Sequence, residues 1–544
     1  MFRGILTSAA RQGAPLRGNR HGMVRGVAVA GGAVALVLMA LSFGSLGAVA
    51  WRAEGWRALG PADWAAVRFT LVQALVSAGL SVALAVPVAR ALARRQLPGR
   101  GALITLLGAP FLLPTLVAVM GLLAVFGRNG IASQALGILG LPPLQIYGFV
   151  GVVLAHVFFN LPLATRLLLQ GWLAVPSERF RLAAALGFSR RDVFRHLEAP
   201  MLREMVPGAF LVIFLLCLTS FAVALTLGGG PRATTVELAI YQAFRFDFDL
   251  SKAAVLALVQ FALCAVAALV ALGVAAPTGF GAGLDRPLLR PDLGGNRGPG
   301  RALAVWDGAM IGLAAVFLLV PLAMILWRGV PHLAGLPGAV WWAAGRSVGV
   351  AMVSAALCIG AALVLALAVE ATRGAFSRGL EVVGMVSLAA SPLVIGTGLF
   401  IVVFPLMDPA RLALPVTALV NAAMALPFAL RAILPALRAA EASQGRLADH
   451  LGLTGGARLR LVILPRLRRP MGFAAGLAGA LSMGDLGVIV LFAEREGATL
   501  PLQLYRLMGA YRSDDAAGAA VLLLGLSLLI FWAFDRGGRA HAAT

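Results

Sequence analysis

Charged residues are scarce in this chain of 544 residues, where Asp, Glu, Lys and Arg together make up 12%. Soluble domains carry about a quarter of their residues as charges. Hydrophobic residues account for 60% of the chain, and its mean hydropathy is +0.91. Such a composition excludes a water-soluble globular protein of this length, and it indicates a chain that folds in a lipid bilayer.

Acidic residues are rarer than basic ones, with 23 Asp and Glu against 45 Lys and Arg and a formal net charge of +22. A nucleic-acid-binding surface needs basic residues gathered on one water-facing patch. Here they form short clusters between long apolar runs, so we expect no nucleic acid as a partner.

Cysteine and lysine are nearly absent. The three cysteines, Cys217, Cys264 and Cys358, lie in apolar runs and form no metal-ligand spacing, so no metal site is expected. The only lysine, Lys252, follows Ser251 and does not belong to a Gly-Lys-Ser/Thr phosphate-binding loop. The chain is therefore not expected to hydrolyse ATP or to bind a cofactor of its own.

Long apolar runs are abundant instead. A helix needs about 20 apolar residues to cross a bilayer, which only helices and closed barrels can do. The predicted fold class is an all-α polytopic membrane protein with about twelve spans. The first apolar run follows a basic head but is too long for a signal peptide, so it is expected to remain as a span. The spans are expected at 26–50, 68–89, 102–126, 147–170, 206–227, 253–275, 303–327, 347–370, 382–405, 412–434, 471–493 and 516–534.

The basic residues also predict orientation, because basic loops stay on the cytoplasmic side. The N-terminus and every second connection hold 32 of the Lys and Arg residues, against 13 on the other side. A biased genome composition would explain the choice of Arg over Lys but not this asymmetry. Both termini are therefore expected to be cytoplasmic, in a multi-pass protein of the bacterial inner membrane.

The chain contains an internal repeat. At a constant offset of 265, Pro162 matches Pro427, Gly187 matches Gly452 and Pro200 matches Pro465. Further on, at an offset of 264, Tyr241 matches Tyr505. Both halves start on the cytoplasmic side, so the repeat is parallel, and a translocation path is expected between the halves.

This repeat predicts the domain organisation. The stretch between the halves is rich in Pro and Gly, so it is expected to be a cytoplasmic linker. The expected units are an N-terminal tail at 1–25, a first half at 26–275, the linker at 276–302, a second half at 303–536 and a C-terminal tail at 537–544.

The best-matched stretch is a cytoplasmic connection, which reads RLAAALGFSRRDVFRHLEAP at 181–200 and RLADHLGLTGGARLRLVILP at 446–465. Each copy begins with a helical run, turns at a Gly and ends at a Pro. Such a helix-turn-helix with basic side chains is suited to docking in a groove of a soluble partner. A basic loop on lipid headgroups is the alternative, but it does not require the same thirteen-residue spacing from Gly to Pro twice.

This stretch resembles the EAA loop of permeases in binding-protein-dependent ABC importers, which inserts a coupling helix into each ATPase subunit. Arg181 and Arg446 stand where the family has Glu, so a salt bridge of that Glu is not carried over. The resemblance implies two copies of a cytoplasmic ABC ATPase, which uses ATP and Mg²⁺. The coupling residues it implies are Arg181, Ala183, Ala184, Gly187, Phe188, Pro200, Arg446, Ala448, Gly452, Leu453 and Pro465.

Two further segments, 218–249 and 484–515, resemble bacterial thiamine/thiamine pyrophosphate importer permeases through the strings GGGP, ELAIYQ and GDLGVI. The resemblance implies import of thiamine or its phosphates. Ferric-iron permeases, which also have two fused six-span halves, are the nearest alternative. A secondary carrier of the 6+6 type is more remote, because such carriers use ionisable residues inside spans and only Asp485 lies well within one.

Candidates for the substrate path come from the fifth and eleventh spans. They are Thr219, Ser220, Phe221, Ser482 and Asp485. An aromatic face and a carboxylate suit the thiazolium cation of thiamine. Alternatively, Asp485 accepts hydrogen bonds from backbone freed near Gly484 and Gly487, and the hydroxyls join helices together.

The extracytoplasmic segments at 228–250 and 494–515 are expected to meet a periplasmic substrate-binding protein. The contact candidates are Gly229, Pro231, Tyr241 and Tyr505. The alternative is a simple loop with tyrosines at the membrane interface.

Overall fold

The computed structural model describes residues 16–52, 59–95, 100–107, 112–228, 230, 233–274, 301–385, 387, 391–494 and 497–539. Every regular element in these ranges is a helix, which confirms the all-α fold. The proposed linker lies outside the described residues except for 301–302, which begin a helix. Helix α1 (Leu16–Met39) begins within the stretch 1–25, and α23 (Ser513–Arg539) extends into the stretch 537–544.

Ten helices in the described ranges are long and apolar enough to cross a membrane, close to the expected twelve. The chain is therefore a multi-pass membrane protein. These helical stretches are Arg25–Arg52, Pro61–Arg94, Thr115–Ile138, Phe149–Ala174, Arg190–Leu218, Leu250–Ala271, Arg301–His332, Gly338–Ala371, Pro409–His450 and Ser513–Arg539.

The two remaining expected spans are each divided between two helices. The first consists of α16 (Ala375–Val383) and α17 (Pro392–Val403). The second consists of α20 (Leu464–Gly484) and α21 (Ile489–Phe492). Ser391 explains the start of α17, because its hydroxyl accepts hydrogen bonds from the backbone N–H groups of Leu393 and Val394.

The fifth span of the first half is divided in the same way, into α10 (Ala199–Leu218) and α11 (Phe221–Leu227). The third span contains α4 (Arg100–Leu106) and α5 (Thr115–Phe126), the latter beginning directly after Pro114. Proline fixes φ and lacks a backbone N–H, so it favours a helix start at this point. The third and fifth spans of both halves are therefore discontinuous helices.

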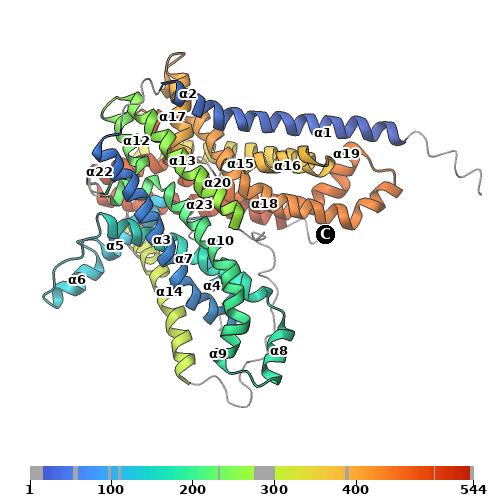
Figure 1. Ribbon diagram of the computed structural model, residues 1–544. Coiled ribbons are helices and arrows are strands. Elements are labelled where there is room, and N and C mark those ends of the chain that lie inside the picture. The colour runs from blue at the N-terminus through green and yellow to red at the C-terminus, as the bar shows by residue number, and fades with distance from the viewer. Residues whose placement is uncertain are drawn as a thin grey trace, which may run out of the picture.

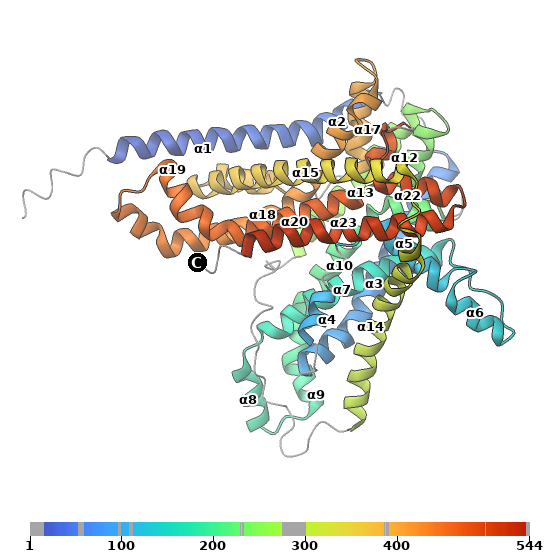
Figure 2. The same ribbon diagram turned by 180° about the vertical axis from the view of Figure 1, so that it is seen from behind.

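The helices form two arms that diverge from a common end (Figures 1 and 2). The first arm contains mainly helices of the first half: α3 (Pro61–Arg94), α7 (Phe149–Ala174), α10 and also α14 (Arg301–Gly329). The second arm contains α15 (Gly338–Ala371), α18 (Ala413–His450), α20, α23 and also α1. The first helix of each half thus crosses to the other half, since α1 packs on α15 and α14 packs on α3 and α5.

Two glycines at equivalent positions allow this crossing. A Cβ atom on Gly398 of α17 would lie 2.4 Å from the backbone oxygen of Ser45, in α2 (Ser45–Arg52), which continues the first span. A Cβ atom on Gly121 of α5 would lie 2.7 Å from the backbone oxygen of Pro321 in α14. Gly398 follows Gly121 by 277 residues, the same offset that separates the first residues of α3 and α15. The crossing contacts therefore repeat about the pseudo-symmetry of the two halves.

Alanine at either glycine is expected to weaken the joint between the halves. The added methyl group would meet backbone, which cannot rotate away, so we expect Gly121→Ala or Gly398→Ala to lower the free energy of unfolding by about 1–3 kcal/mol. Thermal unfolding in detergent measures this loss. Gly345→Ala in α15 is the control, because nothing lies within 4 Å of its added Cβ. Unchanged melting of both crossing variants would contradict the close approach.

Ionic contacts fix the crossing helix on the first arm. Asp307 of α14, 3% exposed, accepts a hydrogen bond from Nε of Arg95 at 2.9 Å and also faces Arg94. On the second arm, α1 contacts α15 at Gly31, where an added Cβ would lie only 2.2 Å from the Cβ of Ala368. The same crossing is thus stabilised by charge on one side and by close apolar packing on the other.

Candidate functional site

A cavity of about 340 Å³ lies between the two halves. Its lining comes from α5, α7, α10, α11 and α12 (Val236–Arg245) of the first half and from α17, α18 and α20 of the second. The discontinuous helices supply much of the wall, because the cavity touches the start of α5, the start of α17 and the breaks after α10 and α20. Helix breaks leave backbone groups free for other partners, and membrane transporters use them to form binding sites.

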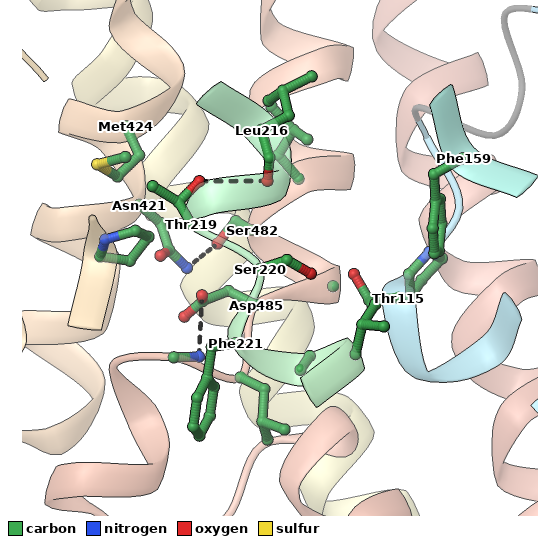
Figure 3. A pocket seen from close by; sticks show the side chains of 18 of the residues that line it. Thr115, Phe159, Leu216, Thr219, Ser220, Phe221, Asn421, Met424, Ser482 and Asp485 are labelled. Carbon is green, nitrogen blue, oxygen red and sulfur yellow. Dashed lines mark hydrogen bonds between the residues drawn. The ribbon is translucent and has the colours of Figure 1, made fainter. Parts of the chain in front are cut away.

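All five sequence candidates for the substrate path line this cavity (Figure 3). Thr219 and Ser220 occupy the break between α10 and α11, and Phe221 is the first residue of α11. Ser482 lies near the end of α20, and Asp485 follows its last residue. The structure therefore brings together residues that are more than 260 positions apart in the sequence.

The hydroxyl groups of these candidates bond mainly within the protein. Thr219 Oγ1 donates to the carbonyl oxygen of Leu215 at 3.3 Å. Ser482 Oγ accepts from Asn421 Nδ2 at 3.0 Å and donates to Ser354 Oγ at 3.1 Å. These bonds orient the polar side of the cavity and join α15, α18 and α20, so the alternative role in helix association is present as well.

The two carboxylate oxygens of Asp485 have different surroundings. The sequence leaves two roles open for this residue, namely accepting hydrogen bonds from freed backbone and contacting the substrate. Oδ1 accepts the backbone N–H of Gly487 at 3.2 Å, which satisfies backbone freed by the helix break. Oδ2 is buried and has no hydrogen-bond partner in the described part of the chain. Oδ1 therefore has a structural role, while Oδ2 faces the cavity region near the Asn421 amide.

Sequence reasoning missed several polar residues of the lining, namely Thr115, His156, Asn160, Glu237 and Asn421. His156 and Asn421 are separated by 265 residues, the offset of the internal repeat, and this offset was the signal that could have found them. Ser77 Oγ contacts His156 Nδ1 at 3.2 Å, whereas Asn421 Nδ2 donates to Ser482 Oγ. Ser354, which lies 277 residues after Ser77, is joined to Asn421 only through Ser482. Glu237 is in α12 (Val236–Arg245) and is 1% exposed.

A second cavity of about 320 Å³ contains both candidate tyrosines. Tyr241 is 6% exposed and packs edge-on against Phe221 at 5.4 Å between ring centroids. Tyr505, in α22 (Leu500–Gly509), is partly buried. Tyr241 is therefore buried, whereas Tyr505 is partly exposed. The other two candidates for this contact, Gly229 and Pro231, lie outside the described residues.

The repeated stretch forms the same turn in both halves. In the first half it joins α8 (Ser177–Ala185) to α9 (Arg190–Val193), and in the second it joins α18 to α19 (Gly455–Arg458). Gly187 has φ +68° and Gly452 has φ +65°. Nothing lies within 4 Å of a Cβ built on either glycine. Glycine is therefore favoured by its left-handed conformation and not by a lack of space.

Equivalent hydrogen bonds close the two turns. The backbone N–H of Phe188 donates to the carbonyl of Ala183, and that of Leu453 donates to the carbonyl of Ala448, both at 2.9 Å. This is the bonding pattern of a Schellman motif, in which a glycine ends a helix. The coupling candidates Ala183 and Ala448 are both buried behind the turns, at 3% and 2% exposure.

Both turns lie at the free ends of the arms (Figure 1). We call them the coupling turns, residues 181–200 and 446–465. Their outer faces are apolar at equivalent positions, with Leu182, Leu186, Leu447 and Leu451 each about 60% exposed. Of the other candidates, Arg446 and Ala184 are exposed. Arg181 pairs with Glu178 at 3.0 Å, and Pro200 and Pro465 lie in the first turns of α10 and α20.

The two coupling turns are supported from behind in different ways. In the first, Phe180, Ala183 and Val193 form a small buried apolar cluster. At an offset of 265, Gly445 replaces the phenylalanine and Arg458 replaces the valine.

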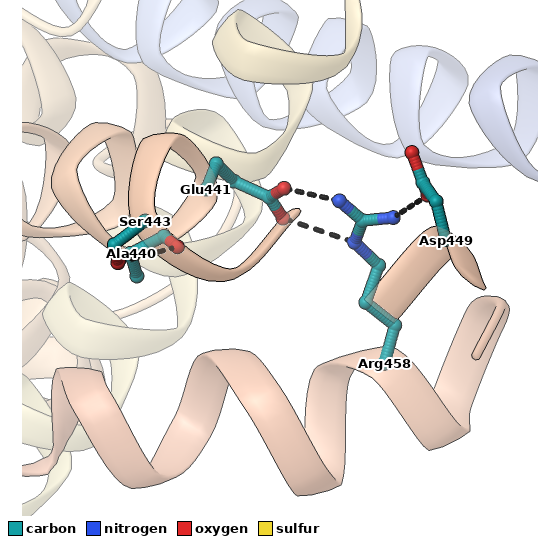
Figure 4. Close-up of polar contacts among 5 residues, drawn as sticks. All are labelled: Ala440, Glu441, Ser443, Asp449 and Arg458. Atoms are coloured by element: carbon teal, nitrogen blue, oxygen red, sulfur yellow. Dashed lines mark hydrogen bonds and ion pairs between the residues drawn. The ribbon is translucent and has the colours of Figure 1, made fainter. Parts of the chain in front are cut away.

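The arginine of the second turn binds two carboxylates in place of the apolar cluster (Figure 4). Arg458 Nε donates to Glu441 Oε1 at 3.1 Å, its Nη2 pairs with Glu441 Oε2, and its Nη1 pairs with Asp449 at 2.7 Å. The hydrogen bond to Glu441 raises the pKa of Arg458 above its ordinary value, so the guanidinium stays charged. Charge thus replaces apolar packing in the second turn.

Two homologous membrane halves around a shared cavity, each with an exposed turn at its free end, define a transport permease. The thiamine transport system permease protein ThiP of Brucella abortus (strain 2308) is 40% identical over 529 residues, which cover 94% of this chain and 96% of that protein. The ThiP of Escherichia coli (strain K12) is 37% identical over 530 residues, covering 95% and 98%. The chain belongs to the family of thiamine transport system permeases.

A molybdenum transport system permease protein, ModB of Azotobacter vinelandii, is 30% identical over 178 residues, which cover 33% of this chain and 78% of that protein. No protein-family model matches the chain. The likeness to a permease of less than half the length agrees with a chain built from two permease halves.

Proposed function

We propose that this chain is the transmembrane permease of an ABC importer that carries thiamine or thiamine phosphates across the bacterial inner membrane. Substrate would pass between halves 26–275 and 303–536 by alternating access, driven by ATP hydrolysis in a partner. The observation that carries this proposal is the cavity between the halves, on a scaffold that bears a coupling turn on each arm. Thiamine as the substrate is supported by the names of the relatives, which align with nearly the whole of this chain.

The coupling turns are proposed to bind two copies of a cytoplasmic ABC ATPase. Each turn exposes a pair of leucines, which would be buried in a groove on that subunit. The chain itself would bind no cofactor, and the partner would use ATP and Mg²⁺.

The opposite end of the molecule is proposed to receive a periplasmic substrate-binding protein, through surface around Tyr241 and Tyr505. The N-terminal end of α1 and the C-terminal end of α23 lie near the tip of the second arm (Figure 2). If the coupling turns are cytoplasmic, both termini are therefore cytoplasmic as well.

Reconstitution tests the proposed function. The chain is placed in proteoliposomes with its ATPase and candidate binding proteins, and ATP hydrolysis is measured with thiamine and with ferric iron. We expect thiamine to stimulate hydrolysis several-fold and iron to have no effect.

Stimulation by iron and not by thiamine would show that the substrate is iron, and the chain would still be the permease of an ABC importer. Thiamine uptake without the ATPase, driven by an ion gradient, would overturn the importer class in favour of a secondary carrier. Liposomes with the ATPase but without the binding protein are the control for basal hydrolysis.

A further inference from the structure

Glu237 is a carboxyl group enclosed in the protein. The residue is 1% exposed, lines the cavity between the halves, and interacts with the Ser391 hydroxyl at the start of α17. Its Oε1 atom has no hydrogen-bond partner in the described part of the chain. An unpaired buried carboxylate is costly, so it is retained where it has a function.

Asp485 adds a second carboxylate to the same cavity from the other half. It is close enough to Glu237 for the two groups to repel each other. Its Oδ2 atom is likewise unpartnered among the described residues. None of the described residues that line this cavity is Lys or Arg. The described lining therefore holds two buried carboxyl groups and no Lys or Arg side chain to pair with them.

The remaining lining suits an organic ligand. Phe159, Phe221 and Phe428 offer aromatic faces, which attract cations through the ring quadrupole. His156, 3% exposed, has its Nε2 atom unpartnered among the described residues. A volume of about 340 Å³ falls in the range of small-molecule sites.

We propose that Glu237 and Asp485 form the anionic side of a binding site for a small organic cation inside the cavity. The permease would then select for positive charge itself, in addition to any selection by the protein that delivers the substrate. Phe159, Phe221 and Phe428 would hold the apolar part of the ligand, and His156 would bind a polar substituent. This inference rests on the proposed function, because thiamine is the organic cation that the site would receive.

Binding to the permease without its delivery protein tests this site. The permease–ATPase complex is placed in nanodiscs, and equilibrium binding is measured for thiamine and for its neutral oxidation product thiochrome. We expect the wild type to bind thiamine at least about tenfold more tightly than thiochrome. We expect the Glu237→Gln/Asp485→Asn double variant to lose this preference, because the amides keep the shape of the side chains and remove their charge.

Thiochrome also reports whether the cavity of the double variant remains intact. Glu204→Gln, an exposed position on α10 outside the cavity, is the matched control and should bind both probes as the wild type does. An unchanged preference in the double variant, or an equal loss of both probes, would overturn the inference. Displacement of thiamine by Mg²⁺ but not by tetramethylammonium would assign the carboxylates to a metal ion instead.

A failure of this inference can be told from a failure of the proposed function. If wild-type nanodiscs bind neither probe while the complete importer still takes up thiamine, the internal site is wrong and the transport function stands. If the complete importer takes up no thiamine, the proposed substrate is wrong.

Discussion

Replacing Gly187 and Gly452 together by valine is expected to abolish ATP-dependent thiamine uptake while the chain still inserts into the membrane. Both glycines have positive φ, where an L-residue costs about 1–2 kcal/mol and a β-branched residue is disfavoured further. Nothing within 4 Å blocks a new side chain, so the strain falls on the backbone of the turn alone. The turn would open, and the exposed leucines on each arm would no longer meet the ATPase together.

Two measurements check this expectation, namely thiamine uptake and ATP hydrolysis in proteoliposomes. Gly187→Asn/Gly452→Asn is the matched control, because asparagine tolerates the left-handed conformation, and it should retain most of the uptake. Normal uptake by the valine variant would show that the coupling turns do not transmit the motion of the ATPase.

Arg458→Met is expected to loosen the second coupling turn and leave the first one intact. Arg458 and Glu441 have side chains 19% exposed, so removing the arginine leaves a largely buried carboxylate without its partner. We expect a local loss of about 2 kcal/mol, below the 3–5 kcal/mol of a fully buried pair. Binding of the ATPase to the second arm should weaken accordingly.

Hydrogen exchange of 455–463 detects this loosening, and 190–198 of the first turn serves as the internal reference. Adding Glu441→Gln to Arg458→Met should recover part of the loss, because it removes the uncompensated charge. Equal exchange of the second turn in the wild type and in Arg458→Met would show that the ion pairs do not stabilise it.

The sequence predicted the class of fold well, because twelve apolar runs and a constant offset are long-range patterns. It placed unbroken spans at 382–405 and 471–493, where the structure has discontinuous helices. Mean hydropathy cannot distinguish a continuous helix from a discontinuous one, because single polar residues such as Ser391 and Asp485 scarcely lower the average of an apolar stretch. The crossing of α1 and α14 was not predicted either, because hydropathy does not report which helices pack together.

The candidate site, like the fold, could be predicted from the sequence only in part. Residues within the best-matched segments, such as Gly187 and Asp485, could be singled out from the repeat. Glu237 was missed because an acidic residue outside an apolar run resembles an ordinary loop residue, and only the fold shows that it is buried. Arg458 occupies the position in the second half that is equivalent to Val193 in the first. This difference became informative only when the structure showed Glu441 beside Arg458.

The crossing of the first helices has a consequence for the order of synthesis. Helix α1 leaves the ribosome first, yet α15, on which it packs, is made only after the whole first half. Helix α14, in contrast, emerges when α3 and α5 are already in the membrane. The nascent first half must therefore keep α1 in lipid without its final neighbour. If the chain were cut at the connection between the halves, each fragment would carry one helix that belongs on the other, so the two would have to be produced together.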